Sequence, residues 1–208
     1  FNLLLHRYTA QDDIVVGSPI ANRNHVETEN LIGCFINTLA LRTNLAGSPT
    51  FRELLGRVRE VTFDAYAHQD LPFELLISRL QPERKANTTP LFQVWFALGN
   101  TPAVQFDLPG ISISRIDSGR EVSQFDLTLT LGETPFGLDG LLNYNSDLFA
   151  AETVAQMVQH FLKLLEEVAL CPDLQLFDVQ LHEEESNGFG NVSGEPVQAG
   201  ISEDEFVL

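Results

Sequence analysis

The stretch FDLTLTL at residues 125–131 decides how the chain folds. Apolar residues occupy its odd positions, and Asp126, Thr128 and Thr130 occupy the even ones. This period of two predicts a strand with one buried and one exposed face. Residues 138–144 are expected to pair back against it through a turn at Thr134–Gly137. The apolar face of such a hairpin needs a covering layer.

The strongest helical pattern of the chain follows directly and supplies that layer. Apolar residues recur at helical spacing from Val154 to Val168, and Pro172 ends the helix. The stripe consists of Val154, Met157, Val158, Phe161, Leu164, Leu165 and Val168. A sheet with helices packed against it is predicted, which is an α/β fold.

Two further helices are predicted upstream. Thr50 and Glu53 have the spacing of a capping box, and an apolar stripe runs from Phe51 to Ala65. A shorter helix is expected to begin near Pro72, because proline is tolerated in the first turn.

Three other stretches are interpreted as strands. Ile14–Val16 is a short β-branched run, and Gly17, Ser18 and Pro19 are expected to close it with a turn. Residues 32–43 (IGCFINTLALRT) are longer and apolar, and residues 90–98 (PLFQVWFAL) indicate a strand buried on both faces. The alternation at residues 111–115 indicates a further strand.

Composition limits the class of protein. The chain has 208 residues and a formal net charge of −17, so nucleic acid and anionic membrane surfaces are not expected partners. No run of 18 apolar residues suggests a transmembrane helix. The chain begins at Phe1 in an apolar run without the features of a signal peptide, which indicates a piece of a longer protein. Cys34 and Cys171 are interpreted as buried free thiols in a reducing, cytoplasmic compartment.

The acidic residues gather at one end. Residues 183–208 contain seven Asp and Glu and no Lys or Arg, with several glycines. We interpret residues 1–182 as the folded domain and residues 183–208 as a linker or disordered tail.

No catalytic machinery is recognisable from side-chain spacing alone. The five histidines do not have metal-ligand spacing to one another or to a cysteine, and no metal site is predicted. His160 is expected to pack at the edge of the core. The chain also lacks G-x-S-x-G, a glycine-rich phosphate loop and H-E-x-x-H.

Several motifs nevertheless occur in a specific order. They are IVVGSPIANR, IGCFINTLALR, HQDLPFELL, PLFQVWF, FDLTLTL and the segment from LNYNSDLFA through the last helix. Together they resemble the condensation domains of non-ribosomal peptide synthetases, over about residues 1–182. The resemblance implies a chloramphenicol-acetyltransferase-like lobe with a mixed sheet, and specifically the C-terminal lobe of a condensation domain.

The family's catalytic signature, His-His-x-x-x-Asp-Gly, belongs to the first lobe. No two adjacent histidines occur in this sequence, so no catalytic residue is assigned to it. The resemblance implies amide-bond formation between a carrier-bound acyl or peptidyl donor and an aminoacyl acceptor. This chain would supply one wall of the substrate tunnel and would be inactive alone.

The resemblance also carries residue assignments. Ser18, Asn37 and Asp126 are assigned to the tunnel wall, Asn37 with an alternative role in holding backbone and Asp126 as a partner for an arginine. The matched motif residues, expected to be structural, are Gly33, Thr38, Arg42, His68, Gln69, Asp70, Pro72, Phe73, Glu74 and Pro90. The stretch before Pro90 departs from the family pattern but keeps Arg84.

The implied partners are the N-terminal lobe, peptidyl carrier domains and neighbouring synthetase domains. No cofactor is expected on this chain, because the phosphopantetheine arms belong to the carriers. Because this chain is acidic and carrier domains are often acidic too, docking is expected to rest on local apolar and basic patches, for which Arg7 and Arg23 are candidates.

Alternative functions stay open at this point. The lobe could be a non-catalytic docking or relic module. It could also come from an epimerisation domain or from an acyltransferase that uses coenzyme A. The amino acids joined cannot be read from this lobe.

Overall fold

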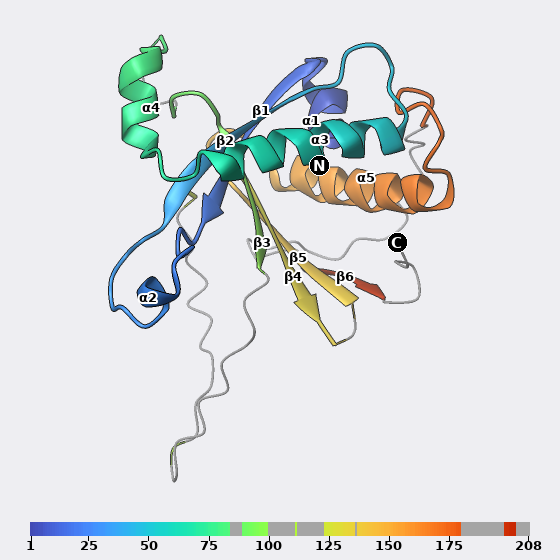
Figure 1. Cartoon of the computed structure of the whole chain (residues 1–208). Coiled ribbons are helices and arrows are strands. Elements are labelled where there is room, and N and C mark those ends of the chain that lie inside the picture. Colours follow the sequence, from blue (N-terminus) through green and yellow to red (C-terminus); the bar gives the residue numbers. More distant parts are fainter. Residues whose placement is uncertain (84–88, 100–110, 112–122, 136, 180–197, 203–208) are drawn as a thin grey trace.

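The computed structural model describes residues 1–83, 89–99, 111, 123–135, 137–179 and 198–202 (Figure 1). Within these residues the chain forms one mixed sheet with the order β2-β1-β3-β4-β5-β6. The strands are β1 (Asp13–Ile20), β2 (Asn37–Asn44), β3 (Val94–Gly99), β4 (Leu127–Thr134), β5 (Gly137–Tyr144) and β6 (Gln198–Ser202). The helices are α1 (Asn2–Thr9), α2 (Val26–Glu29), α3 (Phe51–Ala67), α4 (Phe73–Leu80) and α5 (Ala151–Leu170).

The predicted hairpin is confirmed. Strand β4 pairs antiparallel with β5 from Leu127↔Tyr144 to Thr134↔Gly137. On its other side β4 pairs parallel with β3, and β1 pairs antiparallel with β2 along its whole length. Strands β1 and β3 are parallel and share the single register position Gly17↔Trp95.

The predicted helices are also confirmed. Thr50 and Glu53 form the capping box of α3, with Glu53 N–H donating to Thr50 Oγ1 (3.2 Å) and Thr50 N–H donating to Glu53 Oε2 (2.8 Å). Helix α4 begins directly after Pro72. Helix α5 buries five residues of its predicted stripe and ends before Pro172. The sequence pattern did not predict α1, whose buried leucines join the core.

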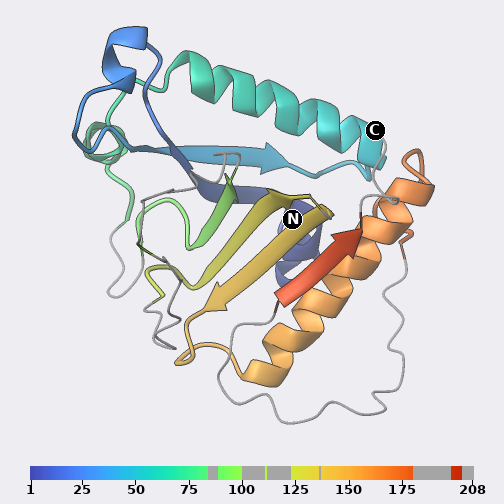
Figure 2. The same cartoon turned by 90° about the horizontal axis from the view of Figure 1, so that it is seen from below.

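The core lies on one face of the sheet. One apolar cluster joins α1, β1, α3 and the end of α5, and a second joins β4, β5 and the start of α5. Figure 2 shows α5 along one side of the sheet and α3 beside β2. The described helices thus leave the opposite face of the central strands without a packed layer.

The first strand is longer than predicted. Gly17, Ser18 and Pro19 do not close it, because β1 continues to Ile20 in antiparallel pairing with β2. Gly17 is needed inside the strand: a β-carbon there would collide with the ring of Phe92. The prediction of a turn at these residues is therefore wrong.

Two other strands are shorter than predicted. Within residues 32–43 the strand begins only at Asn37, and Ile32 is fully exposed in the loop before it. Within residues 90–98 the strand begins at Val94, and it is half-buried rather than covered on both faces. Its far end is open, with Leu98 50% exposed.

The predicted burial of the cysteines is wrong, since Cys34 and Cys171 are both exposed. Cys34 lies in the loop before β2, and Cys171 follows the last turn of α5.

The predicted tail contains β6, which pairs antiparallel with β5 from Leu141↔Gln198 to Gly137↔Ser202. The predicted strand at 111–115, His182 and Arg84 lie outside the described residues. No described helix is long and apolar enough to cross a membrane.

Candidate functional site

A row of side chains crosses the open face of the sheet. Gly17 is aligned with Trp95, Trp95 with Thr128, and Thr128 with Asn143. Aligned residues of neighbouring strands point to the same face, and successive residues alternate. The neighbours of this row, such as Val16 and Leu129, are buried on the helix side. The row therefore faces away from the core.

A pocket of about 480 Å³ opens above this row. Its lining residues come from β2, the start of α4, β3, β4, β5 and the segments that lead into β3 and β4. They are Thr38, Phe73, Thr89, Phe92, Trp95, Ser123, Gln124, Phe125, Thr128 and Asn143. None of these lining residues carries a charge.

Four aromatic rings form one side of the pocket. Trp95 and Phe125 are stacked, with ring centroids 4.8 Å apart and planes 6° apart. Phe92 contacts both, with centroid distances of 6.0 Å to Trp95 and 5.6 Å to Phe125, and Phe73 lies 5.5 Å from Phe92. Phe92 is 2% exposed and anchors the group. The rings thus support one another and hold a fixed wall.

Asn37 stands at the edge of this pocket, next to Thr38, and holds the loop before α4. Its Nδ2 donates to Gln69 O (2.7 Å) and Leu71 O (2.8 Å), and its Oδ1 accepts from Phe73 N–H (3.2 Å). The side chain satisfies backbone groups that precede a helix and would otherwise be unpaired. Asn37 therefore has the backbone-holding role that the sequence left as an alternative, and it positions Phe73.

The other two residues assigned to the tunnel wall, Ser18 and Asp126, do not line the pocket. Ser18 is half-buried within β1, opposite Leu39. Asp126 is fixed by its backbone, which donates to Gln93 O (2.9 Å) and accepts from Asn145 N–H (3.0 Å). Burial raises the pKa of the Asp126 carboxyl above its usual value. No ion pair of Asp126 is found among the described residues.

The HQDLPFE motif is a device for ending one helix and starting the next. His68 caps α3, and its Nδ1 lies 2.8 Å from Asp64 O. Gln69 Nε2 donates to Tyr66 O (2.9 Å), while Gln69 Oε1 is buried and has no hydrogen-bond partner in the described structure. Asp70, Pro72 and Glu74 are exposed, and of this motif Phe73 reaches the pocket.

The remaining motif residues lie apart from the pocket. Arg42 makes an exposed ion pair with Asp13, with Arg42 Nη2 2.6 Å from Asp13 Oδ2. The hydrogen bonds that Arg42 donates to the Asp13 carboxylate lower the pKa of Asp13. Gly33 accepts a hydrogen bond from Arg23, and Pro90 is half-buried in the segment before β3.

The two arginines proposed for carrier docking are engaged within the chain. Arg7 Nη2 donates to Leu176 O (2.9 Å) and Val179 O (2.6 Å). Arg23 donates to Thr28 O and to Gly33 O (3.0 Å), and its guanidinium lies 4.3 Å above the ring of Phe35. Both guanidinium groups are therefore engaged within the chain, and their role in carrier docking stays a prediction.

The described histidines do not form a catalytic group. His160 lies at the core edge as predicted, with Nδ1 2.9 Å from Tyr8 Oη. His6 stacks on Phe177, and His25 and His68 are exposed. No group of His, Cys, Asp and Glu that could hold a metal ion occurs among the described residues.

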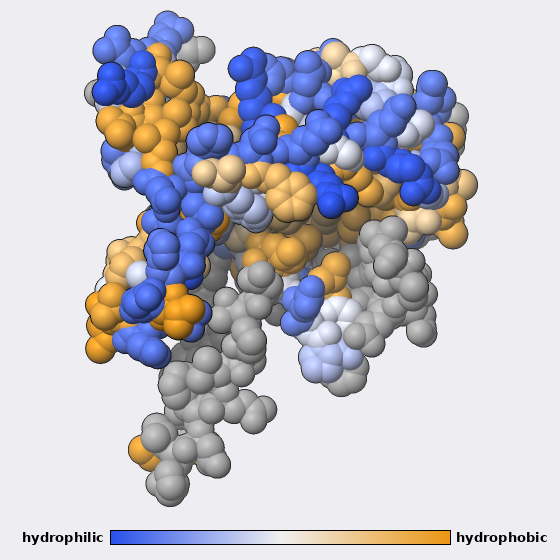
Figure 3. All heavy atoms as spheres, in the orientation of Figure 1, coloured by the Kyte–Doolittle hydropathy of each residue, from blue (hydrophilic) through white to orange (hydrophobic). Residues whose placement is uncertain are grey.

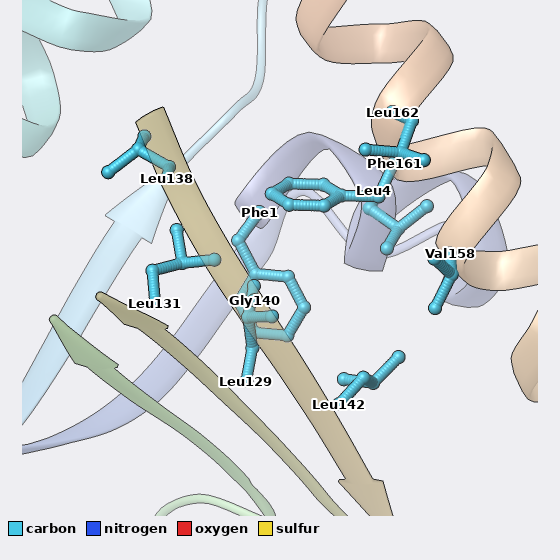
Figure 4. A pocket seen from close by; sticks show the side chains of 10 residues that line it. All are labelled: Phe1, Leu4, Leu129, Leu131, Leu138, Gly140, Leu142, Val158, Phe161 and Leu162. Atoms are coloured by element: carbon cyan, nitrogen blue, oxygen red, sulfur yellow. The ribbon is translucent and has the colours of Figure 1, made fainter. Parts of the chain in front are cut away.

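A second cavity, of about 30 Å³, lies on the helix side of the sheet (Figure 4). Phe1, Leu129, Leu142 and Phe161 are among its lining residues, all of which are apolar or glycine. None of the predicted site residues lines it, so we interpret it as a packing feature of the core.

Sequence reasoning missed Trp95, Phe92 and Asn143 as pocket residues. The sequence pattern places Phe92 and Trp95 in a strand buried on both faces, and Asn143 in the returning strand of the hairpin. One signal was available: Trp95 is the single tryptophan of the chain.

Comparison with known proteins identifies the family of the chain. Residues 1–188 match the condensation-domain family. A linear gramicidin synthase of Brevibacillus parabrevis is 52% identical over 187 residues, which are 89% of this chain and 4% of that protein. A dimodular nonribosomal peptide synthase of Bacillus subtilis (strain 168) is 45% identical over 192 residues, covering 88% of this chain and 8% of that protein.

Solved structures with a similar fold are found in peptide biosynthesis. The X-domain from teicoplanin biosynthesis in its complex with OxyB has a TM-score of 0.78 at 29% identity, over 88% of this chain and 41% of that chain. A four-domain nonribosomal peptide synthetase, holo-AB3403, has a TM-score of 0.80 at 24% identity, over 89% of this chain and 15% of that chain, and supports the fold. This chain thus spans a small part of its relatives. It belongs to the condensation-domain family of nonribosomal peptide synthetases.

Proposed function

We propose that this chain is the C-terminal half of a condensation domain and forms one wall of the tunnel in which an amide bond is made. The donor is a carrier-bound acyl or peptidyl thioester, and the acceptor is a carrier-bound aminoacyl thioester. The phosphopantetheine arms belong to the carrier domains and are part of the substrates. The proposed location is the cytoplasm.

One observation carries the proposal. Three motif segments that are far apart in sequence meet at one pocket, through Thr38 of IGCFINT, Phe73 of HQDLPFE and Thr128 of FDLTLTL. This pocket lies on the sheet face that the described helices do not cover. A wall of this kind is suited to enclosing a substrate against a second body.

The chain would not catalyse the reaction alone. The attacking amine must be neutral, and the oxyanion of the tetrahedral intermediate must be stabilised. None of the pocket-lining residues is a His, Asp, Glu or Lys that could accept the proton. The catalytic histidines are therefore proposed to come from the N-terminal lobe.

The test is reconstitution of the domain. The reading frame upstream of Phe1 is sequenced, and the segment it encodes is co-expressed with this chain. The pair is mixed with two loaded carrier domains, and amide formation is followed by mass spectrometry. We expect product from the pair and none from this chain alone. Product from the chain alone, or none from a pair that carries adjacent histidines, would contradict the proposal.

A second candidate is a recruitment module without condensation activity. It is favoured by the likeness to the X-domain, whose structure was solved in complex with OxyB. In that case the reconstituted pair would bind a partner enzyme and never join the carrier-bound substrates. Turnover with a free coenzyme A thioester would instead indicate the coenzyme A-dependent relative, and inversion of a carrier-bound residue the epimerisation domain.

A further inference from the structure

The pocket on the open face differs in chemistry along its lining. Phe73, Phe92, Trp95 and Phe125 form an aromatic wall, whereas Thr128 and Asn143 place a hydroxyl and an amide on the neighbouring strands. A charged group that entered this wall would lose hydration without gaining an ion partner from the lining residues. An apolar or aromatic group would gain contacts with the rings.

Trp95 occupies the centre of this arrangement. It lies between Gly17 and Thr128 in the register of the sheet, so its indole stands on the open face. Stacking on Phe125 and contact with Phe92 fix the indole on two sides. Trp95 is half-buried and lines the pocket, which leaves part of its surface available to a bound group.

We infer that this pocket receives the amino-acid side chain of one of the two carrier-bound substrates, that it selects uncharged apolar or aromatic side chains, and that Trp95 sets the selectivity. This inference rests on the proposed function and adds the substrate class. Trp95 acts on specificity by direct contact and has no role in proton transfer. The rings of the aromatic wall already hold one another in place, so the protein loses little conformational freedom when a flat or branched substrate side chain binds to them.

The test measures binding separately from catalysis. The intact condensation domain, with both lobes, is titrated by calorimetry with pantetheine analogues in which a stable amide replaces the thioester. Three analogues carry phenylalanyl, alanyl or aspartyl groups, and they are offered on the donor and on the acceptor side in separate arms. We expect the phenylalanyl analogue to bind about tenfold more tightly than the alanyl one in one of the arms, and the aspartyl analogue to bind most weakly.

Two variants and a control connect that preference to Trp95. Trp95→Ala is expected to remove most of the phenylalanyl advantage and to leave alanyl binding within about twofold. Trp95→Phe keeps a ring and should retain part of the advantage. Leu98→Ala lies on the same strand but is 50% exposed and does not line the pocket, so it should bind like the unaltered domain.

The remaining outcomes contradict either the inference about the pocket or the proposed function. Equal binding of the three analogues in both arms, or an equal loss for all three in Trp95→Ala, contradicts the inference. Selective binding by a domain that forms no amide contradicts the proposed function and leaves the inference intact. Amide formation by a domain that shows no preference among the side chains supports the proposed function and contradicts the inference.

Discussion

The ring of Phe92 lies directly on the backbone of Gly17. A β-carbon at Gly17 would stand 2.7 Å from Phe92 Cδ2 and closer still to two further ring carbons. The contact joins β1 to the segment that leads into β3, and it anchors the aromatic wall of the pocket.

We therefore predict that Gly17→Ala destabilises the fold. Overpacking of this kind costs about 1–3 kcal/mol, and Phe92 is too buried to move aside freely. The free energy of unfolding in urea measures the change. Gly56→Ala is the control, because Gly56 is exposed in α3 with nothing within 4 Å of an added β-carbon. Alanine should stabilise that helix by about 0.5–1 kcal/mol. If both substitutions changed the free energy of unfolding by the same amount, the contact between Phe92 and Gly17 would not limit the size of the residue at position 17.

Asn37→Ala is expected to loosen the loop before α4. Three hydrogen bonds are lost, each worth about 0.5–1.5 kcal/mol, so the total is expected near 2–3 kcal/mol. Hydrogen exchange at the Phe73 amide should accelerate more than exchange in α5. Asn44→Ala removes one exposed side-chain hydrogen bond to Ala46 N–H and serves as the matched change. If Phe73 exchanges at its original rate, Asn37 does not hold the loop.

Asp126→Asn is expected to stabilise this chain at neutral pH. Burial raises the pKa of Asp126 in the folded state above the usual 3.8, so the neutral form is favoured by folding. The associated stability is present below the unfolded pKa and is lost as pH rises through the folded pKa. The variant should therefore gain stability at pH 7, and the difference should vanish at acidic pH. Thermal unfolding across that range measures it.

The same substitution separates two roles for Asp126. If an arginine of the N-terminal lobe pairs with this carboxylate, Asp126→Asn should destabilise the assembled domain while it stabilises the isolated chain. A gain in both forms would rule out the predicted arginine partner.

Arg7→Leu is expected to lower stability and thereby to confirm the structural role of this arginine. The substitution removes two hydrogen bonds from a charged donor, each worth about 1.5–3 kcal/mol, and leaves Leu176 O and Val179 O without it. The midpoint of urea unfolding is the measurement. Arg52→Leu, whose ion pair with Asp173 is exposed, should change the midpoint little. An unchanged midpoint for Arg7→Leu would show that these two hydrogen bonds contribute little to the stability of the fold.

The sequence predicts most elements here because their signals are local. The alternation from Phe125 to Leu131, the capping box at Thr50 and the stripe of α5 each depend on neighbours within one element. The errors arise where contacts between residues far apart in sequence determine the local structure. Gly17, Ser18 and Pro19 have the composition of a turn, but pairing with β2 keeps them extended. Ile32 belongs to an apolar run, yet the segment before Asn37 forms an exposed loop.

The site was predicted in part for the same reason. Motif resemblance located the segments that meet at the pocket, but it selected Asn37 and Asp126 for their polarity. The structure uses Asn37 to hold backbone, and the pocket is lined instead by aromatic rings that sequence patterns assign to a core. Which face of β3 is covered depends on the placement of helices far away in sequence. Figure 3 shows apolar surface near α2 and over α4. Val26 of α2 and Leu75 and Leu80 of α4 are exposed.

The single register position shared by β1 and β3 means that the strand ladder alone does not hold the sheet together. Gly17↔Trp95 joins a two-stranded half of the sheet to the half that contains β3, β4, β5 and β6. Val94 and Phe96 of β3 pack against both apolar clusters, and α5 contributes buried residues to both, so side-chain packing joins the two halves where the strand pairing is short. Thr38 stands on one side of the seam, and Thr128 and Asn143 stand on the other. The pocket is therefore lined from both sides of this seam, and its shape depends on the packing of Phe92 against Gly17 where the two halves meet.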